Sequence, residues 1–299
     1  RVRGVMFTGS TEVATLLQRN IASRLDAQGR PIPLIAETGG MNAMIVDSSA
    51  LTEQVVIDVL ASAFDSAGQR CSALRVLCLQ DEIADHTLKM LRGAMAECRM
   101  GNPGRLTTDI GPVIDSEAKA NIERHIQTMR SKGRPVFQAV RENSEDAREW
   151  QSGTFVAPTL IELDDFAELQ KEVFGPVLHV VRYNRNQLPE LIEQINASGY
   201  GLTLGVHTRI DETIAQVTGS AHVGNLYVNR NMVGAVVGVQ PFGGEGLSGT
   251  GPKAGGPLYL YRLLANRPES ALAVTLARQD AEYPVDAQLK AALTQPLNA

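Results

Sequence analysis

Short apolar runs alternate along the chain with stretches in which apolar residues recur every three or four positions. The runs predict strands at residues 2–7, 34–37, 43–46, 74–79, 155–163, 177–183, 202–207 and 226–229. The helical spacing predicts helices at residues 13–25, 55–64, 83–98, 188–195 and 212–217. Because strands and helices follow one another in turn, the pattern predicts an α/β fold with a largely parallel sheet.

Two segments stand outside this alternation. Residues 141–151 are polar and acidic, which predicts an exposed loop. Residues from 265 onward lose the strand signals, which predicts a linker followed by a helical tail. The chain begins with Arg1 and enters its first apolar run at once, so we expect it to be an internal piece of a longer polypeptide.

Composition and charge narrow the class of protein. The 299 residues are 43% hydrophobic and 20% charged, which is typical of a soluble globular protein with a sizeable core. The formal net charge of -5 argues against broad binding to nucleic acid or to anionic membranes. No apolar run is long enough to span a membrane. Three cysteines without a CxxC pair exclude a disulfide scaffold and a cysteine zinc site, and they suit a reducing compartment.

Glu37 is a candidate general base. It directly follows an apolar run, so its carboxyl group should be partly buried, and burial raises a carboxyl pKa toward the range that general-base catalysis uses. Gly39 and Gly40 follow, and they would let a backbone or a ligand approach closely. From these residues alone, a helix cap or a loop salt bridge is an equally good interpretation.

Cys71 is a candidate nucleophile. It follows a predicted helix that ends near Gly68, and the neighbouring Arg70 adds positive charge that would favour the reactive thiolate. The alternative is a buried structural cysteine, against which the local sequence argues only modestly. Cys78 lies in a predicted strand and Cys98 on a predicted helix, positions that are typical of inert core thiols.

Two turns have both a functional and a structural interpretation. Gly9 and Ser10 lie between a predicted strand and a predicted helix, where unpaired amides can hold a phosphate. Glu172 and Phe174 precede a Gly-Pro turn, where an exposed acid beside an aromatic ring could hold a ribose and its attached ring. Taken singly, each turn is better interpreted as ordinary: a strand–helix connection in the first case and a solvated turn in the second.

A glycine-dense segment covers residues 240–249, and three of its glycines have the spacing GxGxxG. We reject it as a dinucleotide fingerprint because it does not lead from a strand directly into a helix and because Pro252 follows. A close-packed loop lining a site is the better prediction. Backbone amides in residues 233–236 could bind an anion.

Other chemistries find little support. The sequence contains neither a G-x-S-x-G elbow nor a phosphate-binding P-loop motif. No two of the five histidines fall four residues apart, so no helical zinc pair and no metal site is predicted. A cysteine hydrolase would need a histidine partner that no local pattern identifies.

In combination and in this order, five segments resemble motifs of the aldehyde dehydrogenase superfamily over residues 7 to about 250. They are FTGSTEV at 7–13, ETGG at 37–40, GQRC at 68–71, EVFGP at 172–176 and PFGG at 241–244. Cys71 follows Glu37 by 34 residues, the spacing expected of that family. Ser72 and residues 233–235 resemble the branch that oxidises glutamate γ-semialdehyde. The segments are similar to those of bifunctional proline-degrading proteins, which carry a proline dehydrogenase on the same polypeptide.

The resemblance implies an enzyme that oxidises L-glutamate γ-semialdehyde to L-glutamate with NAD. Cys71 would form the covalent intermediates and Glu37 would activate the hydrolytic water. Its implied cofactor-binding residues are Gly9 and Ser10, near the pyrophosphate, with Glu172 and Phe174 at the nicotinamide ribose. Its implied substrate-binding residues are Arg70, Ser72, Gly234, Ala235 and Phe242. FAD would belong to the proline dehydrogenase domain and not to this chain. Another ω-semialdehyde acid as substrate, and a scaffold without catalysis, stay open as alternatives.

The resemblance also implies a domain organisation. Residues 1–40 would end a Rossmann-like NAD-binding domain, 41–250 would form the parallel-sheet catalytic domain, 251–265 a return segment and 266–299 a tail. The family's oxyanion asparagine, and the residues that select NAD over NADP, lie upstream of its cofactor turn, so we expect the isolated chain to be nearly inactive. We expect the full-length protein to be a homo-oligomer in the cytoplasm, with peripheral attachment to the inner membrane as an alternative. Met41, where the family usually has a polar residue, has no functional interpretation.

Overall fold

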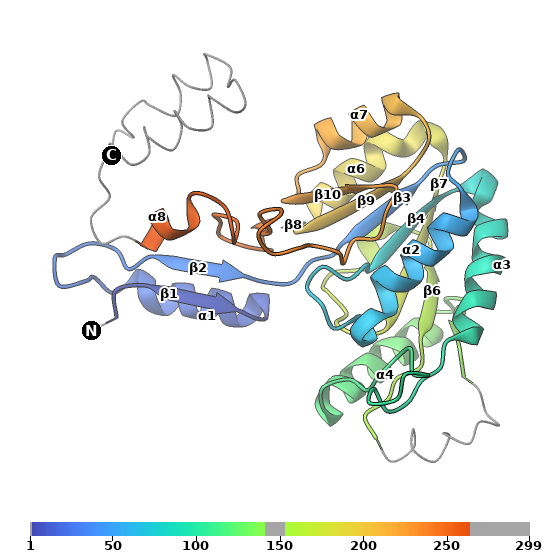
Figure 1. The fold of residues 1–299 in the computed structure, drawn as a ribbon, viewed down its shortest axis with the longest axis horizontal. Coiled ribbons are helices and arrows are strands. Elements are labelled where there is room, and N and C mark those ends of the chain that lie inside the picture. The colour runs from blue at the N-terminus through green and yellow to red at the C-terminus, as the bar shows by residue number, and fades with distance from the viewer. Residues whose placement is uncertain (1, 141–152, 264–299) are drawn as a thin grey trace.

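The computed structural model describes residues 2–140 and 153–263 (Figure 1). The predictions for residues 141–151 and for the tail after residue 265 lie outside the described residues. Within them, strands and helices alternate as the hydrophobic pattern predicts, and the α/β class is confirmed. None of the helices in these two ranges is long and apolar enough to cross a membrane.

Most of the chain forms one seven-stranded sheet in the order β10-β9-β3-β4-β7-β6-β5. Its strands are β3 (Ala43–Val46), β4 (Val76–Gln80), β5 (Val136–Gln138), β6 (Thr159–Leu163), β7 (Val177–Tyr183), β9 (Thr203–His207) and β10 (Asn225–Val228). All neighbouring strands pair in parallel except β5, which runs antiparallel to β6. The central strands β3 and β4 are buried along their whole length, as is typical of parallel strands covered on both faces.

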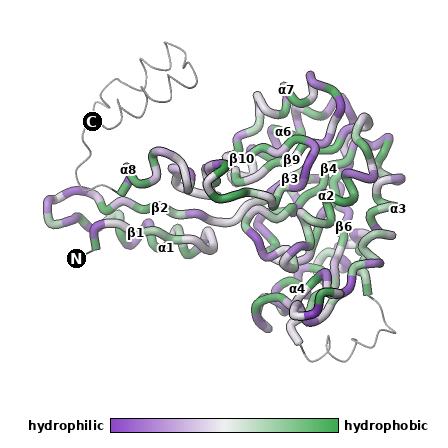
Figure 2. The backbone as a smooth tube through the Cα atoms, in the orientation of Figure 1, coloured by the Kyte–Doolittle hydropathy of each residue, from purple (hydrophilic) through white to green (hydrophobic). Residues whose placement is uncertain are grey.

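Helices cover both faces of this sheet. They are α2 (Thr52–Phe64), α3 (Asp81–Glu97), α4 (Ser116–Ser131), α6 (Leu188–Ala197) and α7 (Asp211–Ser220). The chain moves along the sheet one way from β3 to β4, and the other way from β7 to β9 and β10. Because parallel crossovers are right-handed, α2 lies on one face and α6 and α7 on the other (Figure 1). Figure 2 shows hydrophobic positions concentrated along β3, β4 and α2.

A second, smaller unit carries the start of the chain. Strands β1 (Val5–Thr8) and β2 (Leu34–Glu37) pair in parallel and α1 (Thr11–Ala22) packs beside them (Figure 1). Ser10 caps α1 by accepting a hydrogen bond from the Val13 amide, which stabilises the helix start. After β2, residues 38–42 lead directly into β3 of the large sheet.

The chain returns to this small unit near its end. Strand β11 (Glu245–Gly246) pairs antiparallel with β8 (Tyr200–Gly201), and α8 covers Tyr259–Leu263. The Thr250 amide then donates to the Ala36 carbonyl of β2 at 3.0 Å. The glycine-dense segment is therefore a packed connection between the two units and not the start of a helix, so the rejection of a dinucleotide fingerprint is confirmed.

The structure departs from the predicted elements in a few places. Helix α4 was not predicted, although Ile122, Ile126 and Met129 have helical spacing and are buried. The predicted strand at 155–163 begins only at Thr159, because Pro158 cannot donate to a strand ladder. Three short 3-10 turns were not predicted either: η1 (Asp65–Gly68), η2 (Phe166–Glu168) and η3 (Arg185–Gln187).

Candidate active site

Four of the chemically notable segments lie at one edge of the large sheet. Asn42 precedes β3, residues 71–75 precede β4, residues 172–176 precede β7, and Thr203 begins β9. Because these strands are parallel, their amino ends meet at the same edge. Ligands of open parallel sheets usually bind at the opposite, carboxyl edge. Here the carboxyl end of β2, with Glu37, leads into this amino edge, and the site forms between the two sheets.

The segment before Cys71 makes an unusually tight turn. Ser66, Ala67 and Gly68 have positive φ angles of 56°, 53° and 64°, which is an uncommon left-handed run for non-glycine residues. A Cβ atom on Gly68 would lie 2.2 Å from the Gly175 carbonyl oxygen, so glycine is required there by space as well as by backbone angle. The turn brings the nucleophile segment against the start of β7.

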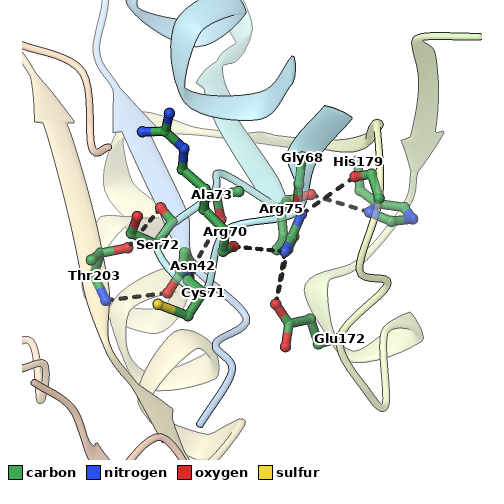
Figure 3. A network of polar contacts seen from close by, with 11 residues as sticks. Asn42, Gly68, Arg70, Cys71, Ser72, Ala73, Arg75, Glu172, His179 and Thr203 are labelled. Atoms are coloured by element: carbon green, nitrogen blue, oxygen red, sulfur yellow. Dashed lines mark hydrogen bonds and ion pairs between the residues drawn. The ribbon is translucent and has the colours of Figure 1, made fainter. Parts of the chain in front are cut away.

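The backbone around Cys71 is held by the buried side chain of Asn42 (Figure 3). The Asn42 Nδ2 donates to the carbonyls of Cys71 at 2.6 Å and Ala73 at 2.8 Å. Its Oδ1 accepts from the Thr203 amide at 3.2 Å, and the Thr203 hydroxyl donates to the Ser72 carbonyl at 3.3 Å. One carboxamide therefore fixes the nucleophile backbone to the first residue of β9.

Arg75 occupies the centre of the site and is only 1% exposed (Figure 3). Its Nε and Nη2 donate to Oε1 of Glu172 at 3.1 and 2.9 Å. Its Nη1 donates to the Gly68 carbonyl at 2.6 Å and its Nη2 to the Arg70 carbonyl at 3.0 Å. Its guanidinium carbon lies 5.0 Å from the centre of the Phe174 ring, within cation–π range.

Glu172 differs from the exposed acid that the sequence predicted. Its side chain is only 13% exposed and is ion-paired with Arg75, so the interpretation as a solvated turn is wrong. Burial raises the pKa of Glu172, while the Arg75 charge and a hydrogen bond from the Gly40 amide lower it. A Cβ atom on Gly39 would lie 1.7 Å from Oε2 of Glu172. Gly39 thus makes room for Glu172 and the Gly40 amide donates to it, so Glu172 joins two segments far apart in sequence.

Glu37 ends β2 and its carboxylate is buried, as predicted. Burial raises its pKa from 4.5 to about 7, while the Gly244 amide acts in the opposite direction. Neither carboxylate oxygen makes a hydrogen bond of regular geometry to a described residue. A Cβ atom on Gly243 would lie 2.9 Å from Oε1 of Glu37, so the glycine-dense loop forms one wall around this carboxyl group. Glu37 can therefore accept a proton near neutral pH.

The pKa of Cys71 contradicts the prediction that Arg70 favours its thiolate. Its pKa is raised, first by burial and then by the negative charges of Glu172 and Glu37. Arg70 does not offset this, because its side chain turns away from the sulfur (Figure 3). Cys71 instead interacts electrostatically with Arg75: burial lowers the pKa of Arg75, and the charges of Glu172 and of a Cys71 thiolate oppose this shift.

The Arg70 side chain turns away from the Cys71 sulfur because its hydrogen-bond partners lie elsewhere. Its Nε donates to the Ser66 hydroxyl at 3.0 Å and its Nη1 to the Val233 carbonyl at 3.4 Å. Arg70 therefore connects the nucleophile segment to the loop that contains Gly234 and Ala235. For Cys78, by contrast, full burial raises the thiol pKa to about 12, as expected of an inert core thiol.

The remaining predicted substrate residues lie around this site. Ser72 is buried directly after the nucleophile. Gly234 accepts a hydrogen bond from Arg230 at 3.4 Å through its carbonyl. The backbone of Phe242 pairs with that of Ala254, at 2.9 and 2.8 Å between amide nitrogen and carbonyl oxygen. Their roles toward a substrate stay predictions.

The predicted cofactor residues border a common region. The Gly9 amide donates to the Glu37 carbonyl at 3.1 Å, so the β1–α1 turn lies beside the general-base candidate. A cleft of about 640 Å³ is lined by Glu12 of α1, by α4, and by Glu172 and Phe174. The carboxylate of Glu172 has acceptor capacity beyond its bonds to Arg75, which suits the hydroxyl groups of a ribose. The cleft beside Glu172 and Phe174 thus fits a ribose and its attached ring.

One pair of histidines comes together through the fold. Nε2 of His125 and Nε2 of His179 lie 2.9 Å apart, although the residues are far apart in sequence. Burial lowers the pKa of His179 to about 3, so this imidazole is neutral. Within residues 2–140 and 153–263, no cluster of three potential metal ligands occurs.

Sequence reasoning missed the two residues that organise the site, Asn42 and Arg75. For each of them, the sequence contains a feature that could have identified it. Arg75 is a charged residue inside the apolar run at 74–79 and directly precedes β4, and a buried cation requires a partner. Asn42 is a carboxamide directly before four buried apolar residues of β3. The identity of their partners could not be read locally, because those partners come from other segments.

Comparisons with known proteins agree with this geometry. Residues 1–265 match the family described as "Aldehyde dehydrogenase family". The chain is 99% identical over its whole length to a protein from Escherichia coli (strain K12) named "Bifunctional protein PutA", of which it covers 23%. A crystal structure of a bifunctional proline utilization A protein superposes with a TM-score of 0.80 at 52% identity, covering 87% of this chain and 26% of that one.

A further solved structure is 1-pyrroline-5-carboxylate dehydrogenase from Thermus with bound NAD. It superposes with a TM-score of 0.78 at 34% identity, covering 89% of this chain and 51% of that one. The chain thus spans about a quarter of the bifunctional relatives and about half of this shorter one. Since the family match covers most of the chain, and the folds agree, the chain belongs to the aldehyde dehydrogenase family.

Proposed function

We propose that this chain carries the nucleophile and the general base of an NAD-dependent L-glutamate γ-semialdehyde dehydrogenase. The observation that carries the proposal is the electrostatic interaction of Cys71 with Glu37, a buried carboxyl group whose pKa is about 7. The similarity to proteins named PutA and 1-pyrroline-5-carboxylate dehydrogenase supports the substrate. The name of the first supports a polypeptide with two activities, of which proline dehydrogenase would be the other.

The reaction would begin with proton transfer from Cys71. Because the pKa of this thiol is raised, only a small fraction is ionised at neutral pH, and a nearby base has to accept the proton. Glu37, with a pKa of about 7, is that base. The thiolate attacks the aldehyde carbon to form a C–S bond, and the carbonyl oxygen becomes an oxyanion. The Cys71 amide, held in place by the Asn42 bonds to this backbone, is one donor to the oxyanion.

Oxidation and hydrolysis would complete the cycle. NAD, when bound, supplies the hydride acceptor, and loss of hydride from the thiohemiacetal carbon leaves a thioester on Cys71. Glu37 releases the proton taken from Cys71 to solvent. It then removes a proton from water, and the resulting hydroxide attacks the thioester carbon. The C–S bond breaks, which releases the carboxylate product and restores the Cys71 thiolate.

The chain's own residues account for part of the binding. Glu172 would accept hydrogen bonds from the nicotinamide ribose, with Phe174 packed nearby, and Gly9 and Ser10 would lie near the pyrophosphate. The backbone amides of Gly234 and Ala235, with the Ser72 hydroxyl, would hold the substrate carboxylate. Phe242 would contact the aliphatic part of the substrate.

The proposal extends to the organisation of the full-length protein. Residues 1–40 would end the cofactor domain, and residues 41–250 would form the catalytic domain. We infer that the isolated chain is nearly inactive, since in its family a further oxyanion donor lies upstream, and loss of one such donor costs roughly 10²–10³-fold in kcat. A homo-oligomer with a cytoplasmic location belongs to the same proposal.

The deciding experiment uses the full-length polypeptide that carries this sequence, with Cys71→Ala as a control. NADH formation is followed with glutamate γ-semialdehyde and with an uncharged aldehyde of similar length. The expected result is a strong preference for the semialdehyde that is lost in Cys71→Ala. Equal turnover of both aldehydes would retain an aldehyde dehydrogenase and reject the substrate, whereas no NADH from either would reject the activity.

A second substrate class could bind through the same carboxylate-binding residues. Another ω-semialdehyde acid would present the same carboxylate to Ser72 and residues 234–235. A series of semialdehyde acids of increasing chain length distinguishes the two, because kcat/KM should peak at the five-carbon substrate. A maximum at another length would replace the substrate while leaving the chemistry of Cys71 and Glu37 unchanged.

A further inference from the structure

We propose that Arg75 is a positioning residue that holds Glu172 and the nucleophile segment in one fixed geometry, so that the cofactor ribose and Cys71 stay in register. The inference rests on the proposed function in one respect, the role of Glu172 toward the cofactor. It goes beyond that function in assigning the alignment of two separate sites to a single buried cation.

The first argument is the distribution of the Arg75 hydrogen bonds. Nη1 donates to the Gly68 carbonyl at 2.6 Å, and Nη2 donates to the Arg70 carbonyl at 3.0 Å, so two nitrogens of one planar group hold both sides of the tight turn before Cys71. Nη1 also donates to the Gly175 carbonyl at 3.3 Å. The guanidinium therefore joins the backbone of the nucleophile segment to the backbone of the turn that carries Glu172.

The second argument is the geometry at Glu172. Nε and Nη2 of Arg75 converge on the same oxygen, Oε1, at 3.1 and 2.9 Å. The other oxygen, Oε2, faces Gly39 across a gap that no Cβ atom could occupy. Arg75 and the glycine together leave the carboxylate a single orientation. The Phe174 ring lies over the same guanidinium, so the aromatic side of the ribose site is held by the same group.

The third argument is the position of Arg75 itself. Its side chain is fully buried at the start of β4, a strand in the middle of the sheet. Its own carbonyl accepts from the His179 amide of β7 at 2.9 Å, and its own amide donates to the Asn42 carbonyl at 2.9 Å. A cation anchored on this rigid frame transmits its position to both turns, because neither turn has regular secondary structure of its own around the reactive residues.

Lysine cannot replace this arrangement. Arginine presents donors in a rigid fork, while lysine has one compact ammonium that keeps the charge but cannot reach three carbonyls and a carboxylate at once. Arg75→Lys therefore tests geometry with the charge retained. The matched control is Arg92→Lys, since Arg92 of α3 is also ion-paired, with Glu162 of β6, and lies outside the site.

The experiment uses the full-length polypeptide and two reactions of the same protein. The first is NAD-dependent oxidation of glutamate γ-semialdehyde, with KM for NAD and kcat measured separately. The second is hydrolysis of p-nitrophenyl acetate without NAD, which needs Cys71 but no cofactor. Rates are normalised to the number of thiols that react in a p-nitrophenol burst, so unfolded protein does not count.

For Arg75→Lys we expect KM for NAD to rise about 10-fold, and kcat and the esterase rate each to fall about 10- to 100-fold per active thiol. Arg92→Lys should leave all three within about 2-fold. A purely structural role would lower the melting temperature and the number of active thiols while the normalised constants stay unchanged, and that result overturns the proposal. A change in only one of the two reactions also overturns it, because the inference requires both sites to move.

Two outcomes need separate treatment. If Arg75→Lys does not fold, the double variant Arg75→Met with Glu172→Gln removes both buried charges and should fold; normal esterase activity in it would overturn the proposal. If the wild-type protein forms no NADH while its esterase activity is normal, the proposed function fails. The inference then fails separately if Arg75→Lys leaves that esterase rate unchanged.

Discussion

The two candidate catalytic groups come from regions of very different construction. Cys71 stands at the edge of a seven-stranded sheet whose central strands β3 and β4 are buried along their whole length. Glu37 ends a two-stranded unit in which Met6 is 56% and Leu16 is 59% exposed. The first region positions its residue through its own core, and the second through hydrogen bonds to the returning chain. The proposed catalysis therefore depends on alignment between a self-supporting part and a part with little core of its own.

The contacts of the small unit make this dependence concrete. The Thr38 amide donates to the Ser248 carbonyl at 3.0 Å, and the Thr38 hydroxyl donates to the Leu247 carbonyl at 2.6 Å. The Thr250 hydroxyl accepts from the Ala36 amide at 2.9 Å. These bonds join β2 and the residue after it to residues more than 200 positions later, so the position of Glu37 depends on contacts with a distant part of the chain.

The largest expected effect tests the Cys71 region directly. Cys71→Ala in the full-length protein should reduce semialdehyde oxidation below about one-thousandth of the wild-type rate, because no covalent intermediate can form. Cys78→Ala is the matched control, since Cys78 is buried in β4 and should keep most of the activity. NADH formation under saturating substrate measures both. Residual oxidation in Cys71→Ala at a tenth of the wild-type rate would mean that another group is the nucleophile.

The second prediction tests the Glu37 region. Glu37→Gln should lower kcat about 10²–10⁴-fold, because the thioester persists without a base to activate water. In the wild type, the rate should fall as the pH drops through about 7, where Glu37 becomes protonated. Single-turnover NADH release, compared with steady-state turnover, shows which step is slowed. A pH profile in Glu37→Gln that matches that of the wild type would remove Glu37 from this role.

Glu37→Gln should raise stability although it lowers kcat. Folding raises the pKa of Glu37 from 4.5 to about 7, so its favourable contribution is present at low pH and is lost as the pH rises through this interval. Relative to the wild type, Glu37→Gln should therefore gain free energy of unfolding between about pH 4.5 and pH 7. Urea unfolding of the 299-residue chain across this range measures the difference, and a gain at acidic pH instead would contradict the burial of this carboxyl group.

The third prediction compares the two cores. Leu77→Ala, in the middle of β4, should lower the free energy of unfolding by about 2–5 kcal/mol, because a fully buried side chain leaves a cavity. Leu16→Ala, on the exposed side of α1, should change it by less than about 0.5 kcal/mol in the 299-residue chain. Denaturant unfolding monitored by circular dichroism measures both. Equal losses would erase the contrast between the two regions.

The smallest expected effects concern Asn42, which holds the Cys71 backbone, and Thr38, which joins the end of β2 to the returning chain. Asn42→Ala leaves the Cys71 and Ala73 carbonyls without this donor and should cost about 1–3 kcal/mol of stability, with kcat lowered about 10- to 100-fold. Thr38→Val removes one hydroxyl bond to Leu247 and should cost about 1 kcal/mol. A larger loss of kcat in Thr38→Val than in Asn42→Ala would mean that the Glu37 region, and not the Cys71 region, is the more tightly held one.

Local chemistry was enough to predict much of the site. Strand and helix positions follow from hydrophobic period, which is a property of adjacent residues, and the raised pKa of Glu37 follows from the apolar run before it. The expectation that Arg70 favours the Cys71 thiolate failed because adjacency in sequence does not fix the direction of a side chain. The expectation that Glu172 is an exposed acid failed because its burial comes from Arg75 and Gly39, which lie more than ninety positions away.

The type and order of the elements could thus be predicted from short-range patterns. Cys71 and Glu37 could be predicted as reactive groups only from the combination and order of five motifs, because each local pattern had a structural interpretation as well. Only the tertiary structure decided that the site lies at the amino edge of the sheet. It also decided that Asn42 and Arg75 hold the nucleophile backbone, and that buried carboxylates raise the pKa of Cys71. The physical reason is that hydrogen bonding and desolvation act through space, between strands brought together by parallel pairing.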